Sequence, residues 1–508
     1  MRARVRQRAK SHFIPALCLM SKTFLSFLPI CAALLLLLQL FGAANAQDIA
    51  AKIVIDVKAP TNVYVEGTFR NPRNERNLSF LRDFGAGTEI AQRFSNVQLF
   101  DGKKSPVRAR KLMEGEYLAD EPFSSWSYKV DLHSVQNSSS ALVSWLGNNG
   151  GILTLNDLLP QTYRKTSIVI NVSLPLGWQS ATSERELRPN TYEISNLAEA
   201  VFYVGPGQRE NAAKVGNSQV RVNINDDWLF SVTEAASIAT PIFDQYERIF
   251  GSSPADRFII GIRKFPNPIA VDNWEAGTRG RTITIVSSET AFKSRSLQQL
   301  NEQLRHEIFH FWLPNGVNLT GNYDWFYEGF ALYQSLKTGV ALNNIRFDDY
   351  LDTLSRAYKI DRSLNLSLIE ASKNRWAGNN NTRVYARGML VAFLCDLALL
   401  EKSKGKRSVS DLIRQLYEHN RPPHPETDGN TAVLALLRSY SELVPIIDRN
   451  IIGSDSIEWN DLINDAGIES QLIDESAKLK VTEKPSSRQK DLLDKLGYNN
   501  WRKVASKQ

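Results

Sequence analysis

Residues 297–339 read LQQLNEQLRHEIFHFWLPNGVNLTGNYDWFYEGFALYQSLKTG, and this stretch decides the expected fold. Its first part has apolar residues with helical spacing at Leu297, Leu300 and Leu304, which predicts an amphipathic helix. His306 and His310 are four residues apart, so both imidazoles lie on one face of that helix. One metal ion can therefore be reached by both side chains.

The histidine pair points away from the apolar stripe, yet its surroundings are apolar too. Phe309, Trp312 and Leu313 follow on the other flank, so the end of the helix is expected to be buried nearly all round. Two structural histidines, hydrogen-bonded in a layer of packed helices, are the alternative to a metal site. The glutamate between them, Glu307, favours the metal interpretation.

A third metal ligand is expected from Glu328, on a second helix that ends near Gly339. Aromatic residues flank Glu328, and a carboxylate buried among them costs free energy unless it is paired or bound to a metal. The polar loop of residues 314–323 is long enough to fold the second helix back against the first. Catalytic zinc usually keeps three protein ligands and one open position, so we expect one Zn²⁺ per chain.

The roles of the remaining groups follow from charge. Zinc lowers the pKa of its bound water to about 7 and polarises a carbonyl group. Glu307 is placed to take the proton of that water and to return it to a leaving amine. A tetrahedral intermediate would also need a hydrogen-bond donor for its oxyanion.

The chain divides into regions of different character, which predict an α+β multidomain protein. Short alternating runs punctuated by Pro, Gly and Asn predict a β-rich N-terminal domain, and helical patterns dominate beyond Leu297. The predicted boundaries are a signal peptide at 1–46, a β-rich domain at 47–225, a zinc catalytic domain at 226–340, a helical domain at 341–475 and a basic tail at 476–508. The tail is expected to be a solvated appendage, although a surface-binding role is an alternative.

The N-terminal segment has the order of a secretory signal. Basic residues precede an apolar run from Phe24 to Phe41, and a small-residue stretch then ends with Ala44 and Ala46. Cleavage after Ala46 would give a secreted or periplasmic protein; an uncleaved membrane anchor is the alternative. Met20 begins a more compact version of the same signal. No later segment is expected to span a membrane.

Composition excludes several classes of function. The 508 residues are 43% hydrophobic and 23% charged, which is the balance of a globular protein rather than of a disordered or fibrous one. The net charge of +7 comes from the first 46 residues: six of the 61 basic residues lie there with no acid, which leaves 55 against 54 acidic residues. Nucleic-acid binding has no support from that balance. Cys395 is the single cysteine after residue 46, and its apolar surroundings predict a core position.

Several motifs resemble those of known peptidases. The pattern His-Glu-x-x-His followed by Glu-Gly-Phe-Ala is the signature of gluzincin metallopeptidases, and it looks like the aminopeptidase N and glycyl aminopeptidase families. The 17 residues between His310 and Glu328 are close to the aminopeptidase N spacing. Further segments are similar to glycyl aminopeptidase in particular, so that the resemblance covers roughly residues 50–475: Asn77–Asp83, Gly115–Leu132, Val384–Leu397 and Gly405–Tyr417.

The resemblance implies a β-rich N-terminal domain, a thermolysin-like catalytic domain and a helical C-terminal domain. It also implies peptide substrates, the removal of small N-terminal residues such as Gly and Ala, and an oxyanion-stabilising role for Tyr385. A core aromatic at the start of a helix is the alternative for this tyrosine.

Three departures from the family pattern bear on specificity. The residues after 475 are too few for the PDZ domain of glycyl aminopeptidases, and Arg387 stands where the family has lysine. The segment that holds a substrate's free amine is represented only by Asp272–Gly277, in which Glu275 would be the anchor. A zinc endopeptidase, or a non-catalytic protein that binds peptides or a protein partner on a metallopeptidase scaffold, therefore remains as an alternative.

Overall fold

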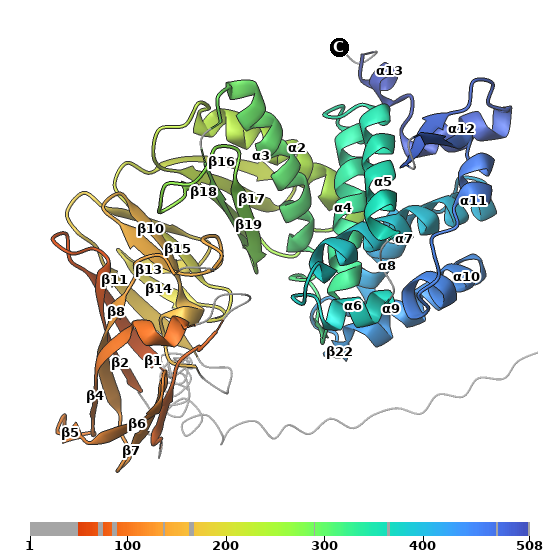
Figure 1. Ribbon diagram of the computed structural model, residues 1–508. Coiled ribbons are helices and arrows are strands. Elements are labelled where there is room, and N and C mark those ends of the chain that lie inside the picture. Colours follow the sequence, from red (N-terminus) through yellow and green to blue (C-terminus); the bar gives the residue numbers. More distant parts are fainter. Residues whose placement is uncertain are drawn as a thin grey trace, which may run out of the picture.

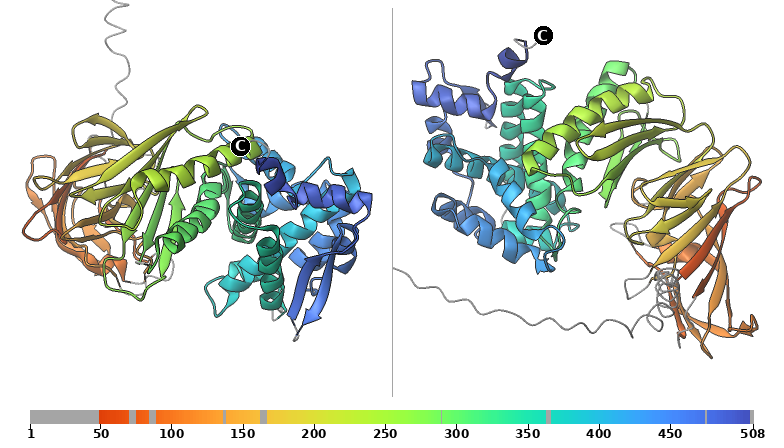
Figure 2. Two further views of the ribbon diagram at one scale, coloured as in Figure 1. Left: turned by 90° about the horizontal axis from the view of Figure 1, so that it is seen from above. Right: turned by 180° about the vertical axis from the view of Figure 1, so that it is seen from behind.

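The computed structural model describes residues 49–69, 75–83, 89–135, 138–161, 167–288, 290–362, 366–473 and 476–505. The predicted signal peptide lies outside these residues. A β-rich part and a helical part lie at opposite ends of the molecule, and a central sheet with two long helices lies between them (Figure 1). The two further views show the same order (Figure 2). The predicted fold class is therefore confirmed.

The β-rich part is built on a large sheet, in which β1 runs parallel to β11 and the other neighbours are antiparallel. Along β1 every second residue is buried, as expected of a strand with one face on a core. In sheet order the strands are β13 (Arg185–Arg188), β14 (Thr191–Ile194), β11 (Ile168–Ser173), β1 (Ile49–Ile55), β2 (Asn62–Phe69), β8 (Ser125–Asp131), β4 (Phe94–Phe100) and β5 (Pro106–Val107).

A smaller sheet, whose two central strands β10 and β15 are buried along their whole length, connects this part to the centre of the molecule. On β10 and β15, Leu153 and Phe202 pack into the core of the large sheet, whereas Ile152 and Tyr203 face Ile259 of the central sheet. The strands of this sheet are β12 (Gln179–Thr182), β15 (Val201–Gly205), β10 (Gly150–Thr154) and β9 (Trp145–Gly147). A three-stranded sheet at the edge has β3 (Asn77–Ser79), β7 (Glu116–Ala119) and β6 (Ala109–Met113); short 3-10 helices are Ile90–Arg93 and Leu155–Asp157.

The central sheet has three parallel strands flanked by an antiparallel strand at each edge. Its order is β16 (Arg209–Val215), β17 (Ser218–Ile224), β18 (Arg257–Lys264), β20 (Thr282–Ser287) and β19 (Trp274–Arg279). Helix α2 (Val232–Phe250) packs on it and begins with a capping box between Ser231 and Glu234. Because β16 and β17 belong to this sheet and its core, the structure places the start of the central unit before the predicted boundary at residue 226.

Helices make up most of the remaining chain. They are α3 (Lys293–Glu307), α4 (Asp324–Ala341), α5 (Phe347–Asp361), α6 (Leu368–Lys373), α7 (Asn380–Ser403), α8 (Val409–Asn420), α9 (Gly429–Arg438), α10 (Val444–Ile446), α11 (Asn460–Asp465), α12 (Ser487–Leu496) and α13 (Asn500–Ala505). Shorter elements are the 3-10 helices Ile308–Phe311 and Ser441–Leu443, the π-helix Ile447–Ile452, and the pairs β21 (Leu319–Thr320) with β22 (Thr427–Asp428) and β23 (Ile468–Ile473) with β24 (Ser476–Val481). One hydrophobic core runs from the central sheet through these helices.

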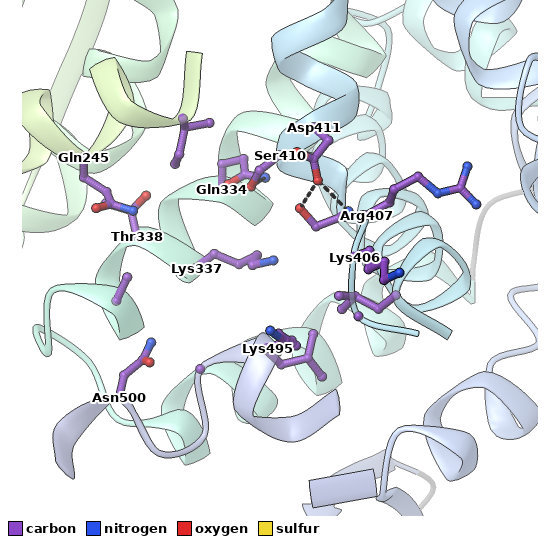
Figure 3. Close-up of a pocket in the computed structure, with 17 residues that line it drawn as sticks. Gln245, Gln334, Lys337, Thr338, Lys406, Arg407, Ser410, Asp411, Lys495 and Asn500 are labelled. Carbon is purple, nitrogen blue, oxygen red and sulfur yellow. Dashed lines mark hydrogen bonds between the residues drawn. The ribbon is translucent and has the colours of Figure 1, made fainter. Parts of the chain in front are cut away.

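The C-terminal segment is packed rather than solvated, and that prediction was wrong. Strand β24 pairs with β23 and buries Leu479, and α12 buries Leu492, Leu493 and Leu496 in the core shared with the central sheet. Three of the basic residues of this segment, Arg488, Lys490 and Lys495, lie on the exposed face of α12. The segment also lines a pocket with α4 and the start of α8, in which Lys337 and Lys495 are found (Figure 3).

Two further predictions concern single features. Cys395 is fully buried in α7, as expected from its apolar neighbours. Within the described ranges we find no helix that combines the length and the apolar character needed to cross a lipid bilayer.

Candidate active site

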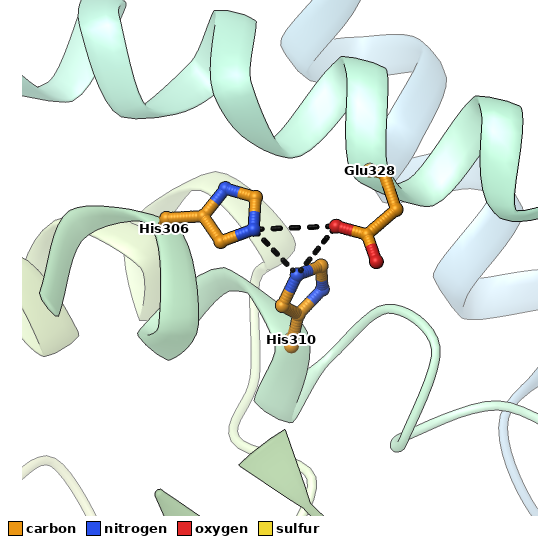
Figure 4. A group of neighbouring side chains, drawn as sticks. All are labelled: His306, His310 and Glu328. Atoms are coloured by element: carbon orange, nitrogen blue, oxygen red, sulfur yellow. Dashed lines mark hydrogen bonds and ion pairs between the residues drawn. The ribbon is translucent and has the colours of Figure 1, made fainter. Parts of the chain in front are cut away.

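His306, His310 and Glu328 converge on one point between α3 and α4 (Figure 4). His306 is in the last turn of α3, His310 follows in the 3-10 helix Ile308–Phe311, and Glu328 is in the second turn of α4. The Nε2 atoms of the two histidines are 3.1 Å apart, and Oε2 of Glu328 lies 3.3 Å from His306 Nε2 and 3.4 Å from His310 Nε2. The structure thus brings together the three residues predicted as metal ligands.

This group fits a metal ion better than a hydrogen-bonded cluster. Oε2 of Glu328 is buried and has no hydrogen-bond partner among the described residues. Tetrahedral zinc with ligand bonds near 2.0–2.1 Å would hold its ligand atoms roughly 3.3–3.4 Å apart, which is close to the three distances found here. A central cation would satisfy all three atoms at once.

The backbone around His310 fixes which of its ring nitrogens faces the group. Nδ1 of His310 lies 2.8 Å from the carbonyl oxygen of Leu313. A carbonyl oxygen can only accept, so Nδ1 carries a proton, and Nε2 is the ring nitrogen that faces Glu328 and His306. Such an outer hydrogen bond orients a metal-binding histidine.

The electrostatics of the group favour an anionic carboxylate beside a cation. Burial alone would raise the pKa of Glu328, but the adjacent imidazole rings of His306 and His310 hold it well below its usual range. Burial alone would lower the pKa of His310, and Glu328 raises it instead. The site remains open to solvent, because 16% of the His306 side chain and 12% of the Glu328 side chain are exposed.

Glu307, the predicted general base, is held by the edge strand of the central sheet. Its Oε2 accepts a hydrogen bond of 2.7 Å from the hydroxyl of Thr278 on β19. Glu307 is itself buried next to the first histidine of the group. The contact with Thr278 thus involves one of the two carboxylate oxygens of Glu307.

Tyr385 lies in the first turns of α7 and faces the metal-ligand group. Its ring centroid is 6.2 Å from that of His306, and its hydroxyl accepts a hydrogen bond of 2.7 Å from Nη2 of Arg375. Burial raises the pKa of Tyr385 well above its usual value, and the charge of Glu328 adds to this effect. The hydroxyl therefore stays protonated and can donate a hydrogen bond.

Glu275 is on the same edge strand as Thr278 but is not part of the metal-ligand group. Its Oε2 accepts a hydrogen bond of 2.9 Å from Ser139, a residue of the β-rich part. Two residues after Gly277, Arg279 also bonds the β-rich part, through the carbonyl oxygen of Leu142 at 2.6 Å. Glu275 thus marks the point at which the β-rich part meets the edge of the central sheet.

Arg387, the departure from the family pattern, has a structural environment. It is buried in α7 and forms an ion pair of 2.6 Å with Asp361 of α5. The arginine fork bonds both carboxylate oxygens of Asp361. Arg387 therefore joins two helices and is not part of the metal-ligand group.

Sequence reasoning missed two residues that contact the predicted site side chains, Thr278 and Arg375. Thr278 is three residues after Glu275 and could have been found only by knowing that β19 is the edge strand beside α3. Arg375 comes from the connection between α6 and α7 and reaches Glu328, Tyr385 and Asp324. No spacing rule links it to the histidine motif.

Solved structures resemble this chain over most of its length, although no family model and no curated protein matches the sequence. An aminopeptidase N family protein from Idiomarina loihiensis is 15% identical, covers 86% of this chain and 82% of its own, and has a TM-score of 0.73. An M1 zinc metallopeptidase from Deinococcus radiodurans is 14% identical, covers 81% and 95%, and has a TM-score of 0.51. A Glu-to-Ala mutant of that metallopeptidase, bound to a Tyr-Ser-Ala substrate, has a TM-score of 0.54 at 14% identity, with the same coverage. The chain therefore has the multidomain fold shared by aminopeptidase N family and M1 zinc metallopeptidase structures, as the resemblance implied.

Proposed function

We propose that this protein is a zinc-dependent peptidase that removes small N-terminal residues from peptides. The observation that carries the proposal is the convergence of His306, His310 and Glu328 at ligand distances, with Glu307 held beside them. The fold, shared with solved zinc metallopeptidases, supports the same conclusion. Zinc held by the three ligands would supply Lewis-acid activation of a water molecule and of the substrate carbonyl.

In this proposal Glu307 moves the proton. Its Oε1 takes the proton of the attacking water while Thr278 holds Oε2, so the carboxylate does not have to rotate to find a partner. The same oxygen then returns the proton to the leaving amine, which makes the amine a neutral product. General acid–base transfer of this kind contributes about 10²- to 10⁴-fold to a rate.

Tyr385 is the donor for the oxyanion. The negative charge that develops on the former carbonyl oxygen needs a fixed donor in addition to any metal, and a protonated tyrosine hydroxyl provides one. The raised pKa of Tyr385 keeps that proton in place across the neutral and mildly alkaline range.

The edge strand β19 offers a place for the substrate backbone. It pairs with β20 on one side, and an extended peptide could add to its other side by strand addition. The β-rich part contacts this strand near both of its ends, through Ser139 at Glu275 and through Leu142 at Arg279. The carboxylate of Glu275 would suit the free amine of a peptide. The Tyr-Ser-Ala complex of the Deinococcus enzyme agrees with peptide substrates.

Two finer parts of the proposal rest on the sequence alone. The preference for Gly and Ala comes from the resemblance to glycyl aminopeptidases. Secretion or a periplasmic location, with cleavage after Ala46, comes from the order of basic, apolar and small residues at the N-terminus. Mass spectrometry of the N-terminus of the exported protein would show Gln47 if this is right.

The proposal is tested by mass spectrometry of defined peptides incubated with the purified protein, with and without a zinc chelator. Each peptide is supplied with a free and with an N-acetylated amine. Loss of single N-terminal residues, Gly and Ala first, only from the free peptides and only without chelator is the expected result. Cleavage of acetylated peptides at internal bonds would establish an endopeptidase instead.

The variant Glu275→Gln tests whether Glu275 binds the free amine of the substrate, separately from hydrolysis of the peptide bond. We expect it to raise KM for free peptides about tenfold or more, since it removes the charge that would pair with the amine. Zinc content should stay at one per chain. If every peptide remained intact while zinc was bound, the molecule would be a peptide-binding protein on a metallopeptidase scaffold.

A further inference from the structure

Arg375 lies at the centre of a polar network beside the metal-ligand group. It belongs to the connection between α6 and α7, and only 11% of its side chain is exposed. Its Nε donates to Asn381 at 2.6 Å and its Nη1 donates to Asp324 at 3.0 Å. The remaining terminal nitrogen, Nη2, lies 2.7 Å from the hydroxyl of Tyr385 and 3.2 Å from Oε1 of Glu328.

The contact with Tyr385 decides what the tyrosine can do. A phenol has one proton to donate and an oxygen that can accept. Because Arg375 has no acceptor atom, it must donate to the tyrosine oxygen, and the tyrosine proton is left to point elsewhere. A hydroxyl that accepts from a cation is polarised and becomes a stronger donor through its own proton. The guanidinium also stacks 5.0 Å from the tyrosine ring centroid, which fixes the ring as well.

The second contact of Arg375 is with Glu328, a predicted metal ligand. Arg375 bonds Oε1, and the histidines face Oε2, so each carboxylate oxygen has its own cationic or metal-facing side. Asp324 begins α4 one turn before Glu328 and accepts from the opposite terminal nitrogen of Arg375, while Ser372 donates to the same aspartate. The arginine is thereby tied to the helix that carries Glu328.

We propose that Arg375 is a positioning residue that orients the Tyr385 hydroxyl for donation and holds Glu328 with Oε2 towards the histidines. This inference rests on the proposed peptidase function and deepens it. The role requires the planar fork of arginine, because one side chain serves four acceptors in fixed directions. Lysine could keep the charge but not the set of contacts.

The test compares Arg375→Met and Arg375→Lys with Lys373→Met, an exposed cation two residues earlier on α6 that serves as the matched control. Arg375→Met is expected to lower kcat about 10- to 100-fold with KM within about threefold, since a donor to a charged or polarised group is lost. The lysine variant should recover only part of that loss. Zinc transfer to a colorimetric chelator, which needs no substrate, should be about tenfold faster or more in Arg375→Met than in the control.

A double-mutant cycle with Tyr385→Phe shows whether Arg375 acts through the tyrosine. If it does, Arg375→Met should lower kcat by less than about threefold in the Tyr385→Phe background. If the factors by which the two single changes lower kcat multiplied fully in the double variant, Arg375 would not act through Tyr385. A wild-type kcat in Arg375→Met would also overturn this part of the proposal. Circular dichroism checks that the variants fold. If Arg375→Met does not fold, the kcat and the zinc-transfer rate of Arg375→Lys test the proposal in its place.

Failure of the proposed function has a different signature. It would appear as a wild-type protein that binds zinc and cleaves no peptide. In that case the zinc-transfer measurement still decides whether Arg375 holds Glu328, and unchanged transfer rates would overturn the inference on their own.

Discussion

Replacing Glu307 by glutamine is the sharpest perturbation of the site. Glutamine has the same shape, and its carbonyl oxygen can still accept the 2.7 Å hydrogen bond from Thr278. The side chain is outside the group of His306, His310 and Glu328, so zinc should remain bound. The amide cannot take a proton from water. General base catalysis contributes about 10²- to 10⁴-fold, so kcat should fall by that factor, or about 3–5 kcal/mol in activation free energy.

The assay measures kcat on a fluorogenic aminoacyl substrate together with zinc per chain by mass spectrometry. Glu302→Gln is the matched control, because Glu302 is an exposed residue of the same helix and loses the same charge. The control should keep wild-type values of both quantities. A Glu307→Gln protein with full zinc and a wild-type rate would refute the general-base assignment. Loss of zinc in that variant would instead show that Glu307 is a ligand.

Further predictions concern the support of the site and the fold. Thr278→Val removes the hydrogen bond to Glu307, worth about 1.5–3 kcal/mol for a charged acceptor, so kcat should fall about tenfold or more, whereas Thr278→Ser should stay close to wild type. Leu493→Ala should lower the free energy of unfolding in urea by about 2–5 kcal/mol, because Leu493 is 1% exposed. The control Leu366→Ala, at a side chain that is 40% exposed, should change the free energy of unfolding by no more than about 0.5 kcal/mol. Burial raises the pKa of the Cys395 thiol, so a thiol reagent should label it only in denaturant; rapid labelling of the native protein would contradict its core position.

The metal-ligand group could be predicted from the sequence because its constraints are local. His306 and His310 are one turn apart, and that spacing survives the change from α-helix to 3-10 helix after Glu307. The prediction of Glu328 as the third ligand required one assumption, namely that the loop of residues 314–323 folds α4 back onto α3. The aromatic neighbours of Glu328 made that assumption plausible, since they need a shared core.

The positioning residues could not be predicted, because tertiary contacts select them. Thr278 contacts Glu307 only because β19 is the edge strand beside α3, and β-sheet order is not readable from strand patterns alone. Arg375 comes after a short helix in an irregular connection, where a single basic residue has the pattern of an exposed side chain. Its partners, Glu328 and Tyr385, are 47 and 10 residues away along the chain.

The error about the C-terminal segment has a physical cause. Net charge suggested a solvated tail, but charge describes only the outward face of an amphipathic helix. Leu492, Leu493 and Leu496 have the i, i+1, i+4 spacing of an inward face, and the structure buries all three. A periodicity test over 487–496 would have favoured packing over the charge count.

Two motif glycines explain why the glutamate ligand and the tyrosine meet at all. Gly329 follows Glu328 on α4, and Gly388 lies three residues after Tyr385 on α7. A Cβ atom at Gly329 would lie 2.4 Å from the backbone of Gly388, and one at Gly388 would lie 2.6 Å from the carbonyl oxygen of Trp325. Any side chain at either position would therefore force the two helices apart. This close contact of α4 and α7 lies next in sequence to Glu328 and three residues from Tyr385, so the glycines of the two motifs set the separation between the predicted metal ligand and the proposed oxyanion donor, which come from distant parts of the chain.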